Sequence, residues 1–131
     1  MADYQIRRKS TSASREIKAS AHYSYITNGI TLDGSKFATG ELVVEGQCLA
    51  RNATTGKFEK VPADDAGGVL KAGYDTPVIL DESVQFVLKD NGTNPDVTVG
   101  QVLVHGAVYA GMLKDATAGF KKALAGAIRF V

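Results

Sequence analysis

The sequence predicts a mainly β (α+β) domain with one short C-terminal helix and an extended N-terminal arm. Apolar residues fall in short runs rich in Val, Leu and Ile, and 14 glycines help to separate these runs. Helical spacing is confined to the region after residue 114. Short apolar runs between turn residues are typical of strands joined by tight turns. Because 131 residues fit one domain, we expect an arm over residues 1–20 and a single body over residues 21–131.

Charge separates the arm from the body. Residues 1–20 hold five basic and two acidic side chains, a formal charge of +3, whereas the remainder holds ten basic and twelve acidic ones, a charge of −2. The arm has little apolar surface to offset roughly 1–2 kcal/mol of backbone entropy per residue. We therefore expect it to stay solvated or to become ordered on a protein partner. Its candidate contact residues are Tyr4, Gln5, Ile6, Arg7, Arg8, Lys9, Arg15 and Lys18.

Strands are predicted wherever β-favouring residues run between turn residues. The clearest hairpin joins residues 49–51 to residues 57–61, where apolar and polar residues alternate. Pro77 predicts the start of a strand or an edge strand, because proline cannot donate to a ladder. Gly100 and Gly106 predict a bulge or a close chain approach. The remaining predicted strands cover residues 22–26, 30–32, 42–44, 48–50, 69–70, 77–80, 84–88, 97–109 and 128–131.

The helix is expected to begin after Asp115, which can cap its first turn. Gly126 stands where a left-handed residue ends a helix. Gly119 inside the helix costs about 1 kcal/mol relative to alanine. The predicted apolar face consists of Ala116, Phe120, Ala123 and Leu124.

Few residues suggest chemistry. His105 could serve as a general base or a metal ligand, but the favoured interpretation is an ordinary strand residue. His22 is the one other histidine. Cys48 is the sole cysteine and is interpreted as a small buried hydrophobe. The acidic residues Asp64, Asp65, Asp81, Glu82, Asp90 and Asp96 lack the spacing of a calcium loop and are interpreted as solvated turn acids.

We therefore expect no enzymatic activity, no cofactor, no metal and no small-molecule substrate. Gly67-Gly68 lacks the arrangement of a phosphate-binding loop. No apolar run approaches the 18 residues of a membrane span, and the N-terminus lacks the apolar region of a secretory signal. Nucleic acid is disfavoured as a partner, because the arm has one aromatic residue and the body is acidic.

A succession of features resembles the lambda-type head decoration protein family of tailed phages. In chain order these are Gly46-Gln47-Cys48-Leu49-Ala50-Arg51, the Thr55-Gly56-Lys57-Phe58 turn, the small-residue segment 62–70, the run Val102-Leu103-Val104-His105-Gly106-Ala107-Val108-Tyr109, an Ala-rich helix, and the final Gly126-Ala127-Ile128-Arg129-Phe130-Val131. His105 stands where the family commonly has another basic residue, and residues 71–96 run longer than the family pattern.

The resemblance implies a small β-barrel or β-tulip-like domain that forms a homotrimer. It implies a virion protein on the capsid exterior, assembled in the host cytoplasm, whose partner is the major capsid protein. The trimer would sit at local three-fold sites of the expanded head and stabilise it. The alternative is a β-barrel adhesion or carbohydrate-binding module of a virion surface fibre, for which Tyr74 and Tyr109 are the candidate sugar-stacking residues.

Overall fold

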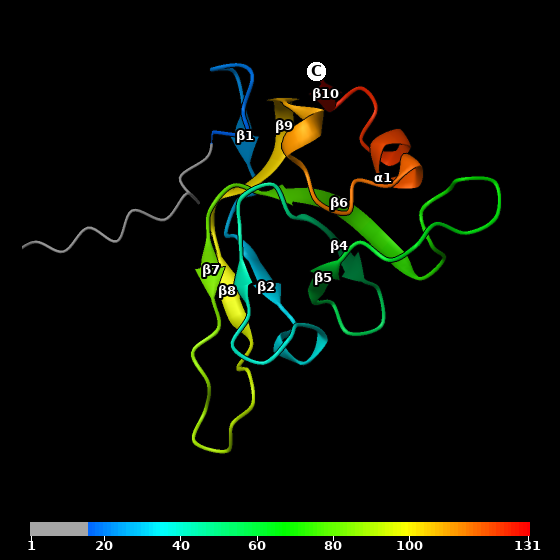
Figure 1. The fold of residues 1–131 in the computed structure, drawn as a ribbon. Coiled ribbons are helices and arrows are strands. Elements are labelled where there is room, and N and C mark those ends of the chain that lie inside the picture. The colour runs from blue at the N-terminus through cyan, green and yellow to red at the C-terminus, as the bar shows by residue number, and fades with distance from the viewer. Residues whose placement is uncertain (1–15) are drawn as a thin grey trace, which may run out of the picture.

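The computed structural model describes residues 16–131 as a mainly β domain built on a curled, half-barrel sheet (Figure 1). The order of the main sheet is β1-β9-β6-β4-β5-β2-β8, with β10 added to β9, and a two-stranded sheet pairs β3 with β7. The strands are β1 Ser24–Tyr25, β2 Ile30–Leu32, β3 Leu42–Val43, β4 Cys48–Asn52, β5 Phe58–Lys60, β6 Tyr74–Leu80, β7 Val84–Gln85, β8 Val97–Val99, β9 Val102–Val108 and β10 Ile128–Phe130. The helices are the 3-10 turns η1 Gly34–Lys36 and η2 Ala110–Met112 and the α-helix α1 Ala118–Ala123.

The central strands are buried on both faces of the sheet. In β6, Val78 and Leu80 join one hydrophobic cluster while Ile79 joins the other. Side chains alternate between the faces of a strand, so neighbouring residues must enter different layers. Strands β4 and β9 divide their residues in the same way. This two-sided burial explains why these segments are nearly continuous apolar runs.

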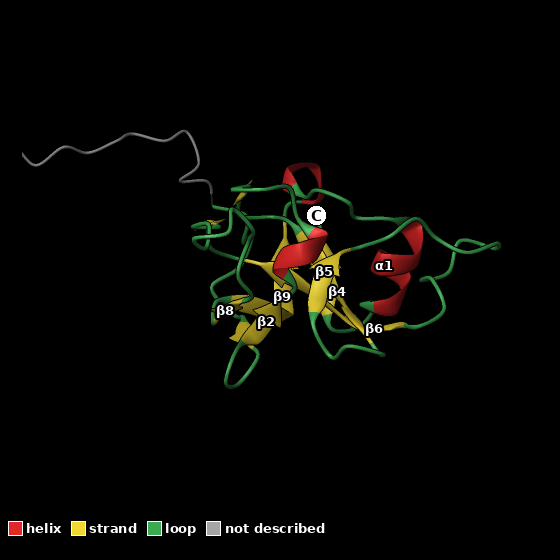
Figure 2. Cartoon of the chain, turned by 90° about the horizontal axis from the view of Figure 1, so that it is seen from below, coloured by secondary structure: helices red, strands yellow, loops and turns green. Residues whose placement is uncertain are grey.

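The outer layer is supplied by chain segments far apart in sequence. Ile17 from the N-terminal side, Phe120 and Leu124 from the α1 region, and Ile128 from β10 all lie in the cluster that contains Cys48 and Leu103. Figure 2 shows α1 beside the strands, near β6. The α1 region, together with Ile17, therefore covers one face of the sheet and separates it from solvent.

The predicted hairpin is confirmed. Strands β4 and β5 pair antiparallel, with Leu49 opposite Lys60 and Arg51 opposite Phe58. Gly56 closes the connection at a φ of 74°, a conformation that glycine adopts without steric cost. Turn chemistry and alternation were sufficient to define this element, because its contacts are local in sequence.

The expected helix cap is wrong. Thr117 is the N-cap of α1, and its hydroxyl accepts a hydrogen bond from the Phe120 backbone N–H at 3.1 Å. Asp115 instead adopts a φ of 61°, and its carboxylate accepts a bond from the Gln47 side chain. The helix is consequently shorter than expected. Ala123 is exposed, although Gly126 has the predicted left-handed backbone.

Strand β6 begins at Tyr74, so Pro77 is not its first residue, but the ladder between β6 and β9 covers only Ile79 and Leu80 and leaves that side of β6 unpaired beside Pro77. Strand β6 pairs with both β4 and β9. Between the pairs Leu49–Val78 and Arg51–Asp75 the register shifts, which leaves one extra residue on β6. The bulge on the β4 side and the unpaired β9 side together remove the need for a ladder donor at that position, so β6 accommodates the proline.

Several strands are shorter than predicted. The pattern over residues 84–88 yields only β7, and Val87 beyond it is 78% exposed. Residues 69–70 contribute a single bridge between Asp65 and Val69. The long run over residues 97–109 divides into β8 and β9. Gly106 in β9 confirms the predicted close approach, since a Cβ there would lie 3.0 Å from that of Tyr23.

Candidate functional site

The residues that follow the described start of the chain are built into the edge of β9. The Tyr109 N–H donates to the Ile17 carbonyl at 2.9 Å, and the Ala19 N–H donates to the Ala107 carbonyl at 2.8 Å. Ile17 is completely buried. The segment Ile17–Ala19 therefore forms an anchor, here called the arm root, which ties the first described residues to the end of β9.

A buried polar cluster holds the arm root in place. The Lys18 ammonium contacts the Asp81 carboxylate at 2.6 Å, and the Tyr25 hydroxyl donates to the same Oδ2 atom at 2.6 Å. The Asp81 and Lys18 side chains are only 4% and 15% exposed. Lys18 also lies 4.9 Å above the Tyr23 ring. These contacts join β1 and the loop after β6 to the N-terminal segment.

The charge states of this cluster follow from its surroundings. Burial by itself lowers the pKa of Lys18, but hydrogen bonds with Asp81 and Glu16 outweigh it, so the Lys18 pKa is raised. Burial and the hydrogen bond to Asp81 both raise the pKa of Tyr25. Lys18 therefore remains an ammonium ion and Tyr25 a neutral phenol near pH 7, as each contact with a carboxylate requires.

Of the candidate contact residues, only Lys18 falls within the described part of the chain. The sequence places it in the arm as a group that faces a partner, whereas its side chain is engaged inside the body with Asp81. The other candidates lie outside the described residues; they are Tyr4, Gln5, Ile6, Arg7, Arg8, Lys9 and Arg15.

The interpretation of Asp81 as a solvated turn acid is wrong, because it is the most buried member of that set. Four others have structural partners, since Asp65 accepts from the Ala72 N–H and Glu82 from the Gln101 N–H. Asp96 accepts from the Gly34 N–H and pairs with Lys57 at 2.6 Å. Asp64 accepts from the Gly119 N–H at 2.9 Å. A cluster of at least three metal-ligating side chains is absent from residues 16–131.

Cys48 is buried, as predicted, and lies in the layer beneath α1. Burial raises the pKa of its thiol to about 12, so the group is a neutral hydrophobe at ordinary pH. His105 is exposed on β9. Tyr74 donates its hydroxyl to Glu59 at 2.7 Å and is partly buried, whereas Tyr109 is 44% exposed.

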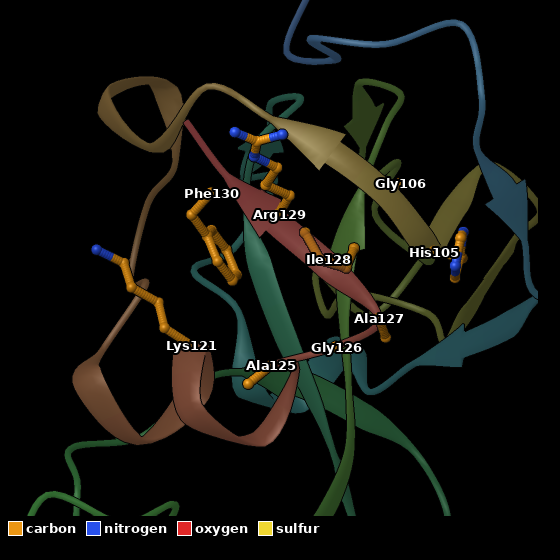
Figure 3. Close-up of a pocket in the computed structure, with 9 residues that line it drawn as sticks. All are labelled: His105, Gly106, Lys121, Ala125, Gly126, Ala127, Ile128, Arg129 and Phe130. Atoms are coloured by element: carbon orange, nitrogen blue, oxygen red, sulfur yellow. The ribbon is translucent and has the colours of Figure 1, made fainter.

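A groove runs along β10, and sequence reasoning missed it. It has a volume of about 550 Å³ and is lined by residues of β9, α1, the following turn and β10 (Figure 3). Its walls bring Lys121 and Arg129 to the same site as His105. The sequence contained a partial signal, namely basic residues on both the predicted helix and the last strand, but their proximity depends on the fold.

Comparison with protein families, curated proteins and solved structures gave no match for this chain. Among residues 16–131, no helix has both the length and the apolar character needed to cross a membrane.

Proposed function

We propose that this protein is a structural subunit that decorates and stabilises the expanded head of a tailed phage. Three copies bind as a trimer at a local three-fold site on the capsid exterior, and the arms contact the major capsid protein. The observation that carries this proposal is the arm root. A basic N-terminal segment is joined to a small β body through a completely buried Ile17 and a buried Lys18–Asp81 pair.

Physical reasoning supports this use of the arm. An extended segment can pair its main chain with an exposed strand edge, so it gains affinity without a deep pocket. In such a strand Tyr4 and Ile6 project to one side, and Arg7 projects to the other with Gln5. A trimer presents three arms together, and linkage of weak contacts raises the overall affinity. A firm root limits the volume that each arm searches and so favours this linkage.

The proposal is tested with purified expanded heads of the cognate phage and the full-length chain. We expect saturable binding in multiples of three copies, and heads that withstand higher temperature once they are decorated. Compact precursor heads should bind weakly, because the sites form on expansion. A protein that remains monomeric at micromolar concentration and ignores expanded heads is not a decoration subunit.

The role of the arm is tested by removal of residues 1–15. The cut stops before Ile17, so the core and the arm root remain. We expect loss of binding to heads with an unchanged trimer and an unchanged thermal transition. The matched control replaces residues 1–15 with a scrambled segment of the same composition, which keeps the charge but changes the strand pattern. Equal binding by the truncated protein would remove the arm from the mechanism.

A further inference from the structure

The groove along β10 combines an apolar floor with a cationic rim. Ile128 is buried and Phe130 half-buried at its base, whereas Lys121, Arg129 and His105 are exposed around it. In Figure 3 these three side chains come from α1, β10 and β9. Lys121 on α1 and Arg129 on β10 thus belong to different elements. Between them lies an apolar surface that a side chain of a ligand can cover.

The rim charges are not neutralised within the described part of the chain. There, the ion pairs of basic side chains involve Lys18, Arg51, Lys57 and Lys60. Lys121 and Arg129 form none of these pairs. Lys122, also on α1, adds another exposed positive charge nearby. The region around the groove therefore attracts negative charge, although the body as a whole is mildly acidic.

Strand β10 also has an outer edge that is only partly occupied, because the Ile128 N–H there donates to the Leu124 carbonyl at 3.0 Å. Among residues 16–131 it pairs with β9 alone, in parallel, and places Arg129 opposite Ala107. The Gly106 N–H donates to the Ala127 carbonyl, and the Val131 N–H donates to the Val108 carbonyl. In a parallel ladder alternate residues direct their backbone groups to the same neighbour. The Phe130 N–H and C=O consequently point away from β9, to the side where another strand can add.

We propose that this groove binds an extended acidic segment of the shell protein, as a contact additional to the arm. The segment adds its backbone to the outer edge of β10. Its carboxylates meet Lys121 and Arg129, and one apolar side chain covers Phe130. This inference rests on the proposed function, because it takes the shell as the source of the segment. It supplies the body with its own attachment site.

The same observations argue against two other occupants. The arm of a second copy carries a charge of +3, so the cationic rim repels it. A nucleic acid would place its phosphates on the rim, but it has no main-chain groups suited to a strand edge and would leave the apolar floor uncovered. A peptide satisfies the rim, the edge and the floor together.

Charge reversal tests the inference. The double variant Lys121→Glu with Arg129→Glu reverses the charge of the rim. Both residues are exposed, so we expect the variant to fold. The matched control is Lys36→Glu with Lys89→Glu, which makes the same change in net charge at exposed positions on η1 and the β7–β8 loop. We expect about tenfold weaker binding of the rim variant to expanded heads and a reduced salt dependence. The control should bind within about twofold of the wild type.

A photo-crosslinking residue at Ala125, an exposed position in the groove, identifies the occupant. Crosslinking to the shell protein supports the inference. Crosslinking to a second copy, no crosslink on decorated heads, or rim-dependent binding of a 30-base-pair DNA probe overturns it. Equal binding of the wild type, the rim variant and the control to heads overturns the inference about the groove but leaves the proposed function intact. Failure of the wild type to bind heads overturns the proposed function and this inference with it.

Discussion

At the scale of single residues, the pKa of the Cys48 thiol reflects the burial of its side chain. Its side chain is fully buried, and its pKa is raised from the usual 9.0 to about 12. Between these values the unfolded chain releases the thiol proton while the folded chain keeps it. The free energy of unfolding contributed by this group is therefore intact below pH 9 and falls as the pH rises towards 12.

We predict a difference in pH dependence between the wild type and Cys48→Ala. Between about pH 9 and pH 10 the wild type should lose up to about 1.4 kcal/mol of stability per pH unit more than the variant, because one proton is involved. Urea unfolding at a series of pH values measures this. Tyrosine and lysine side chains titrate in both proteins, so their contributions to the pH dependence cancel in the comparison. Parallel curves would show that the thiol is not buried.

The Lys18–Asp81 pair is the second residue-scale feature. We predict that Lys18→Met lowers the free energy of unfolding by about 3–5 kcal/mol, because it leaves a buried carboxylate without its counter-ion. Arg51→Met is the matched control, since the Arg51–Asp75 pair is about 40% exposed on both sides and exposed pairs contribute little. Denaturant unfolding compares the two. Equal effects would mean that the Lys18–Asp81 pair is solvated.

At the scale of elements, the position of α1 depends on the close packing of Gly119 against the 64–70 loop. A Cβ at Gly119 would lie 2.5 Å from the Leu70 backbone nitrogen and 2.6 Å from an Asp64 carboxylate oxygen. Helix propensity favours alanine over glycine by about 1 kcal/mol. The contact reverses this preference, because the clash is with backbone that cannot move aside cheaply. The helix can lie on the 64–70 loop only where a residue has no side chain.

We therefore predict that Gly119→Ala destabilises the fold by about 1–3 kcal/mol, the usual cost of overpacking. Gly111→Ala is the matched control, because it makes the same substitution in η2 with no atom within 4 Å of the added Cβ. The control should be neutral or slightly stabilising. Thermal unfolding of both variants gives the answer, and a stabilised Gly119→Ala would contradict the packing of α1 on the loop.

At the scale of the whole molecule, the core includes a residue from the basic N-terminal region. Ile17 joins Cys48 and Leu103 in one hydrophobic cluster, and Ile17 and Ala19 bond to Tyr109 and Ala107 at the end of β9. Residues of the polar N-terminal region thus supply part of the core. The predicted division at residue 20 marks the change in composition, and residues 17–19, on the arm side of it, already contact the core and the β9 region.

Two N-terminal truncations should differ sharply in thermal stability. Removal of residues 1–15 is expected to leave the thermal transition unchanged. Removal of residues 1–19 should cost about 2–5 kcal/mol for the loss of a buried isoleucine alone, with a further cost for the unpaired Asp81. Calorimetry on the two proteins distinguishes them. A transition that is the same for both would place Ile17 outside the core.

The sequence by itself determined the mainly β class, the hairpin between β4 and β5, the last strand, the left-handed Gly126 and the burial of Cys48. Each depends on alternation, turn residues or side-chain polarity, which act over a few neighbouring positions. The functional interpretation also came from the sequence, through a resemblance that only the experiments on heads can test.

Only the tertiary structure decided which distant residues meet. Lys18 and Asp81 are 63 positions apart, and Asp64 is 55 positions from Gly119. The groove likewise requires α1, β9 and β10 to converge. Local patterns specify which face a side chain takes, but the topology of the sheet specifies what lies opposite that face. The arm root, the reversed preference at Gly119 and the cationic groove all follow from that topology.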